Sequence, residues 1–194
     1  MRMVLGVLVV LLAATAAVAG PLDTPGATKA ITCSACHGMG GQSPSNTMPI
    51  IAGIQPAYFK KAIEDYATGK RPSPEMEPYA KMVRDLGVDD VGGYFAAQKR
   101  LPTSIAADPA AVERGRVAAA QCAICHGADG RGDAAKVVPD LRGQPPGYLY
   151  TQMMLFKADK RSPGDANLAA LKALMKGIPD RTLGDLAAYF SSVR

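Results

Sequence analysis

The chain has 194 residues, 48% of them hydrophobic and 20% charged, which is ordinary for one medium-sized globular domain or two small ones. Its formal net charge is +5, and it has neither a low-complexity run nor a charged tail. These values exclude a fibrous or largely disordered protein.

Residues 1–19 have the pattern of a secretory signal peptide. Arg2 supplies a basic start, residues 4–14 are all apolar, and Ala17-Val18-Ala19 has the small side chains of a signal peptidase site. The alternative is a retained membrane anchor, but the apolar run is shorter than the ~20 residues that cross a bilayer. We expect cleavage, a periplasmic location and no membrane span in the mature chain.

The remainder is a tandem repeat. The segment Cys33–Gly38 (CSACHG) recurs as Cys122–Gly127 (CAICHG), 89 positions later. Further matches follow at offsets of 90 and then 95: Gly53, Tyr58, Lys70 and Arg71 with Gly143, Tyr148, Lys160 and Arg161, and Asp90, Tyr94 and Phe95 with Asp185, Tyr189 and Phe190. The second copy is thus five residues longer, and the insertion falls between Arg161 and Tyr189.

Each copy is predicted to run helix, CxxCH, loop, helix, loop, helix, and no alternating stretch favours a sheet. In the middle helix, apolar residues three or four apart mark one buried face: Phe59, Ile63 and Tyr66 in the first copy, and Leu149, Met153 and Phe156 in the second. The prediction is an all-α chain with one domain at 20–101 and another at 111–194.

The segment 102–110 between the copies has the composition of a linker. Asp108 stands directly before Pro109, and these are residue types that begin helices. We therefore expect a helix over Ala110–Ala120, capped by Asp108.

The two CxxCH segments predict covalent haem. The thiols of Cys33 and Cys36 are spaced to add to the two vinyl groups of one haem, and His37 then lies beneath the iron as its proximal ligand. Cys122, Cys125 and His126 repeat the arrangement, which gives two covalently bound haem c groups.

Three other chemistries use CxxC pairs: a four-cysteine zinc site, a thioredoxin-like redox pair, and disulfides in an exported protein. Against all three, a histidine follows each pair immediately, and the sequence has no other cysteine or histidine. Each haem adds a charge of roughly −1 to −2, so the loaded protein is close to neutral and nucleic-acid binding is not expected.

With two histidines in the chain, neither iron can have two histidine ligands. A methionine thioether is the expected sixth ligand, and it raises the reduction potential. In the first copy the candidate is Met76, in the proline-rich segment 72–78, which we predict to be a loop that reaches over the haem. Met48 is the second choice, and gap-filling in a core is the alternative role.

The second copy departs from the first at this position. Met76 lies 18 residues before Tyr94, but the residue 18 before Tyr189 is Leu171. Met175, four residues further on, is the predicted ligand if the longer loop shifts the register. The other possibilities are a five-coordinate iron, or ligation by Met153 or Met154.

These features resemble the di-haem class I cytochromes c, of the cytochrome c-four type and of the haem subunit of flavocytochrome c sulfide dehydrogenase. The resemblance covers nearly the whole mature chain and rests on both CxxCHG motifs and on Ile51-Ala52-Gly53, Leu141–Gln144, Tyr58, Tyr148, Gly69-Lys70-Arg71, Tyr94-Phe95 and Tyr189-Phe190. It implies two class I cytochrome c domains related by a pseudo-twofold axis, haem propionates near their interface, and His/Met-ligated iron in both, with Leu171 departing from the pattern.

The expected function is electron transport and not catalysis, because neither copy has a free histidine, a spare cysteine or a carboxylate pair with catalytic spacing. The resemblance implies redox protein partners: an oxidase, a quinol-oxidising complex or a flavoprotein. One alternative is the electron-accepting subunit of a flavoprotein dehydrogenase, with the flavin on another chain. Another is small-ligand binding at an open second haem.

Overall fold

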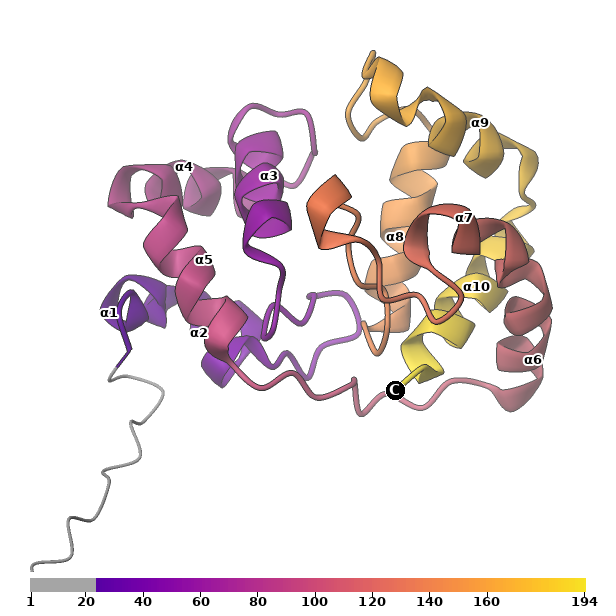
Figure 1. Cartoon of the computed structure of the whole chain (residues 1–194), viewed down its shortest axis with the longest axis horizontal. Helices are drawn as coiled ribbons and strands as arrows, with labels where there is room; N and C mark the ends of the chain where they lie inside the picture. The colour runs from indigo at the N-terminus through magenta and orange to yellow at the C-terminus, as the bar shows by residue number, and fades with distance from the viewer. Residues whose placement is uncertain (1–23) are drawn as a thin grey trace, which may run out of the picture.

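The fold is described from a computed structural model, for residues 24–194 (Figure 1). The predicted signal peptide and residues 20–23 lie outside this range. The described chain is helical, as expected, and its only bridge pairing is an isolated one between Asp133 and Val138. Among residues 24–194, none of the helices combines the length and apolar character that crossing a bilayer requires.

The helices form two groups that lie side by side and are joined by an extended segment (Figure 1). The first group consists of α1 (Ala27–Ala30), α2 (Ser34–His37), α3 (Pro56–Ala67), α4 (Met76–Leu86) and α5 (Val88–Ala97). The second consists of α6 (Pro109–Ala118), α7 (Ala123–His126), α8 (Pro146–Lys157), α9 (Ala169–Gly177) and α10 (Asp180–Ser192).

The helix expected after the linker is present. Asp108 accepts hydrogen bonds from the amides of Ala110 (3.2 Å) and Ala111 (3.1 Å), and Pro109 is the first residue of α6. Residues 109 and 110, predicted as linker, therefore belong to this helix. The linker itself is fixed to both copies, because Thr103 donates to the Gly143 carbonyl at 2.8 Å and Leu101 exchanges two hydrogen bonds with Gln42.

The loop predicted around Met76 is wrong in one respect: Met76 is the first residue of α4. The Ser73 hydroxyl accepts a hydrogen bond from the Met76 amide at 3.2 Å, which helps to start the helix. Pro78 then falls in the first turn, where its missing amide proton costs nothing. The proline-rich composition therefore marks the beginning of a helix here.

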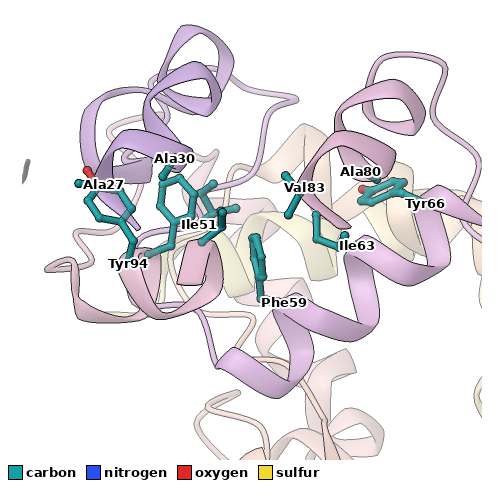
Figure 2. Close-up of a cluster of buried hydrophobic side chains, with 11 residues drawn as sticks. Ala27, Ala30, Ile51, Phe59, Ile63, Tyr66, Ala80, Val83 and Tyr94 are labelled. Carbon is teal, nitrogen blue, oxygen red and sulfur yellow. The ribbon is translucent and has the colours of Figure 1, made fainter. Parts of the chain in front are cut away.

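Each copy has its own hydrophobic core. In the first, the predicted α3 face of Phe59, Ile63 and Tyr66 is buried. Figure 2 shows Ile63 beside Val83 and Tyr66 beside Ala80, where α3 packs against α4. In the second copy, Leu149 is buried and its predicted partners on the α8 face, Met153 and Phe156, are partly buried against the core.

The first and last helices of each copy touch through their backbones. A Cβ atom on Gly115 of α6 would lie 2.0 Å from the Asp185 carbonyl oxygen of α10, and one on Gly26, next to α1, would lie 2.2 Å from that of Asp90. Arg114 holds the Asp185 carboxylate beside this crossing with two hydrogen bonds of 2.9 and 2.7 Å. Both crossings therefore require glycine.

Gly115→Ala is expected to lower the free energy of unfolding by roughly 1–3 kcal/mol, because the added methyl group forces α6 away from α10. The measurement is urea unfolding of the haem-loaded protein. The control is Gly184→Ala in α10, where an added Cβ meets no atom within 4 Å. We expect the control to be neutral or stabilising by up to ~1 kcal/mol. Equal stability of the two variants would contradict the close helix contact.

Candidate functional site

Each CxxCH segment lies on a short helical stretch. Cys33 ends a 3-10 turn that continues directly into α2, which carries Cys36 and His37. Residues three and four apart share one helix face, so both thiols and the imidazole of one motif lie on the same side. Cys122, Cys125 and His126 are placed in the same way at α7.

All four cysteines are free thiols. Cys33 packs against the first core and Cys122 against the second, while Cys36 and Cys125 are exposed. The cysteines thus lie as two separate pairs, each with its own histidine. Within residues 24–194, no three histidine, cysteine or acidic side chains gather as a metal cluster of their own would require.

One ring nitrogen of each histidine is held by the protein. His37 Nδ1 lies 2.9 Å from the Pro49 carbonyl oxygen, and His126 Nδ1 lies 3.0 Å from that of Pro139. A carbonyl oxygen can only accept, so Nδ1 carries the proton and Nε2 keeps a free lone pair. This is the arrangement of a histidine that is oriented to bind iron through Nε2.

Burial lowers the pKa of both histidines, and the hydrogen bonds to Pro49 and Pro139 only partly oppose the shift. Both rings are therefore neutral near pH 7, which is the form that binds metal. Two thiols and one free imidazole nitrogen on a single helical turn match the two vinyl groups and the iron of a haem. The donor set of each copy therefore fits one haem c.

A glycine follows each histidine with a backbone conformation that other residues rarely adopt. Gly38 has φ +74° and Gly127 has φ +75°. At Gly38 a Cβ would lie 2.3 Å from the Gln42 carbonyl oxygen, so the chain folds back tightly behind the histidine. This turn directs the loop toward the proline whose carbonyl holds the ring.

The two predicted methionine ligands occupy different positions. The buried residues of α4 are Ala80 and Val83, and those of α9 are Lys172 and Met175, at a constant offset of 92. Met175 therefore corresponds to Val83, and the counterpart of Met76 is Leu168. Met76 lies partly buried at the start of its helix, whereas Met175 is buried in the second core, in the last turn of α9.

The other methionines considered as iron ligands are only partly buried. Met48 is half-buried in the loop that follows the first motif, and Met153 and Met154 lie on α8, partly buried against the second core. Leu171, where the sequence repeat expects a methionine, is also partly buried against that core.

Tyr58 and Arg71 match Tyr148 and Arg161 in the sequence repeat, but the sequence predicts no role for them. The structure brings them together between the copies. Arg71 donates to the hydroxyl of Tyr148 at 2.8 Å, and Arg161 donates to that of Tyr58 at 3.0 Å. The equal offset of 90 was the available signal, but it does not reveal that each arginine reaches the tyrosine of the other copy.

A second pair of hydrogen bonds joins the copies beside the first histidine. The buried side chain of Gln144 accepts from the Ile50 amide at 2.9 Å and donates to the Ile50 carbonyl at 2.7 Å. Ile50 directly follows Pro49, which holds His37. In the second copy, Asp140 follows Pro139 and forms an ion pair of 3.5 Å with Arg100.

Comparisons with known proteins agree with this geometry. Residues 112–194 match the cytochrome c family. Cytochrome c4 of Pseudomonas aeruginosa is 29% identical over 175 residues, covering 87% of each chain. Cytochrome c-554(548) of Halomonas halodenitrificans is 37% identical over 71 residues, covering 37% of this chain and 82% of that protein.

A thiosulfate dehydrogenase electron acceptor of Stutzerimonas stutzeri is 28% identical over 181 residues, covering 84% of this chain and 80% of that protein. Reduced cytochrome c4 from Pseudomonas stutzeri has a similar structure, with a TM-score of 0.77 at 25% identity, over 86% of this chain and 96% of that one. The chain belongs to the cytochrome c family and is a di-haem electron carrier of the cytochrome c4 type, with two covalently bound haem c groups.

Proposed function

We propose that the chain carries electrons between redox proteins of the periplasm through one haem held by Cys33, Cys36 and His37 and another held by Cys122, Cys125 and His126. The observation that carries this assignment is the identical donor set of the two copies. In each, two free thiols accompany a histidine whose hydrogen bond at Nδ1 leaves Nε2 free to bind iron. When bound, a haem c supplies an iron that gains or loses one electron.

The protein contributes attachment, orientation and the setting of the potential. Pro49 and Pro139 hold the proximal rings through their carbonyl groups. Met76 is the proposed sixth ligand of the first iron, where its thioether favours the ferrous state and raises the potential. Met175 stays a prediction for the second iron, and it lies in the last turn of α9, whereas Met76 lies at the start of α4.

Electron transfer requires contact with partners, and large apolar side chains are exposed near both motifs. Ile124, between the cysteines of the second motif, is 88% exposed, and Met39, just after the first, is 61% exposed. A partner that covers these side chains would remove apolar surface from water, which favours association. They support the proposal that partners approach beside the haem attachment sites.

Thiosulfate dehydrogenase is the electron donor that we propose, because a relative over most of this chain is named as its electron acceptor. An oxidase, a quinol-oxidising complex or a flavoprotein dehydrogenase are the other partners to be compared with it. The predicted signal peptide at 1–19 would deliver the chain to the compartment where it meets them.

The Cys33→Ser/Cys36→Ser double variant is expected to hold one haem per chain and to take up one electron on full reduction, whereas the unmodified protein holds two haems and takes up two. A pyridine haemochrome assay counts the haems, and a stoichiometric reductive titration counts the electrons. Ser34→Ala, between the same cysteines, is the control and keeps both. Two haems in the double variant would refute the attachment site.

Met76→Leu is expected to remove half of the near-infrared sulfur-to-iron absorption of the ferric protein, because one of two thioether ligands is lost. Met175→Leu is expected to remove the other half. Met82→Leu, also in α4, is the control and leaves the band unchanged. An unchanged band in Met76→Leu or in Met175→Leu would show that the residue does not bind the corresponding iron.

Ile124→Lys is expected to slow reduction by thiosulfate dehydrogenase several-fold, because a charge replaces the apolar contact. Stopped-flow mixing with the enzyme and thiosulfate measures the rate. Leu101→Lys adds the same charge at an exposed apolar residue of the linker and serves as the control. Failure of the enzyme to reduce the unmodified protein, while a chemical reductant reduces both haems, would exclude this donor.

A further inference from the structure

Helix α9, which carries Met175, has a buried lysine on the same face as the methionine. The helix packs against α8 and the 3-10 turn before it, at the edge of the second group of helices (Figure 1). Its two buried residues are Lys172 and Met175, three positions apart. Lys172 is only 7% exposed, and a lysine is rarely buried to this extent unless it is paired. The partners of Lys172 therefore bear on how the methionine is placed.

Lys172 fastens α9 to the loop that joins it to α8, residues 158–165. Its ammonium group donates to the Ser162 carbonyl and lies 2.6 Å from the Asp159 carboxylate. The hydrogen bond from Lys172 lowers the pKa of Asp159, which keeps this carboxylate ionised. Asp159 and Ser162 have φ of +54° and +51°, a conformation that residues other than glycine rarely adopt. Lys172 thus helps to hold a loop that is strained at two positions.

The same loop is fixed against the first copy. Ser162 is 2% exposed, and its amide donates to the Lys70 carbonyl at 2.5 Å. The carbonyl of Ser162 accepts from Lys172, as described above. Lys172 therefore connects α9 to a point that the first copy holds in place.

A second lysine fastens the other end of α9. Lys157 is the last residue of α8, and its ammonium group donates to the Ile178 carbonyl at 2.6 Å, directly after the end of α9. The same group forms an ion pair of 2.6 Å with Asp180. Carbonyl groups at a helix end have no partner within the helix, so Lys157 satisfies one of them. Met175 thus lies between two lysine anchors.

Neither anchor has a counterpart in the first copy. The offset of 90 that relates α3 to α8 places Ala67 at the position of Lys157, and the offset of 92 that relates α4 to α9 places Ala80 at the position of Lys172. An alanine side chain can make neither contact. The anchors therefore belong to the copy that has the longer loop and the methionine in the last turn of its helix.

We propose that Lys157 and Lys172 are positioning residues that hold Met175 where it can bind the second iron. This inference rests on the proposed function, with Met175 as the sixth ligand of that iron. A metal ligand keeps its geometry only where packing and hydrogen bonds fix it. A thioether offers little to hydrogen-bond, so the helix that carries it is fixed instead.

The test is the near-infrared sulfur-to-iron absorption of ferric Lys172→Leu and Lys157→Leu, after a pyridine haemochrome assay has shown two haems per chain. We expect each variant to lose most of the half of the band that the second iron contributes. Its reduced form should bind one carbon monoxide per chain, whereas the unmodified protein binds none. The control is Lys176→Leu, an exposed lysine of α9, which removes the same charge and keeps the full band. An undiminished band in either of the first two variants would overturn the proposal.

Asp159→Asn removes the ion pair of Lys172 but keeps its hydrogen bond to Ser162, so we expect a smaller loss of the same half of the band. It is the decisive variant if the leucine substitutions do not load both haems, and a band equal to that of Lys176→Leu would then overturn the proposal. The intensity of one thioether in the unmodified protein, with two haems bound, would refute Met175 as a ligand and this inference with it. A haem count below two in the unmodified protein would refute the two-haem function itself.

Discussion

The hydrogen bond between each proximal histidine and a proline carbonyl is the constraint on which the rest of the structure depends. It assigns the ring proton to Nδ1 and leaves Nε2 for iron. To form it, the chain must reverse direction directly after the histidine, which requires the positive φ of Gly38 and Gly127. The CxxCHG segments therefore include the glycine for a conformational reason as well as the cysteines and histidine for a chemical one.

The same loops carry this constraint to the interface. Pro49 is followed by Ile50, which both donates to and accepts from Gln144 of the second copy. Pro139 is followed by Asp140, which pairs with Arg100 at the end of the first copy. Movement of one copy against the other would thus disturb the orientation of the proximal rings, so docking of the copies and tuning of the haems are physically linked.

The interface is almost symmetric, because the repeat supplies each side with one arginine and one tyrosine that pair across it. Gln152 breaks the symmetry. It accepts from both arginines, while the residue at the matching position of the first copy is Ala62. The different positions of Met76 and Met175 add a second asymmetry. The surroundings of the two haems are therefore expected to differ.

Much of this was accessible from the sequence where a local pattern determines a local structure. The helical class followed from apolar spacing, and the cap of α6 from Asp108 and Pro109. The beginning of α4 was missed because a proline-rich segment is compatible with a loop and with a helix's first turn, and Pro78 takes the second option. The reciprocal arginine–tyrosine pairs were missed because a repeat identifies equivalent residues without showing which copy each side chain contacts.

The most direct test of the two-haem account is the rate at which an electron redistributes between the two haems after rapid, substoichiometric reduction of the protein. If the copies hold the haems together across the interface, redistribution is an intramolecular step, and its rate does not depend on protein concentration. A redistribution rate that rises in proportion to protein concentration would mean that electrons pass only between molecules, and would contradict the account.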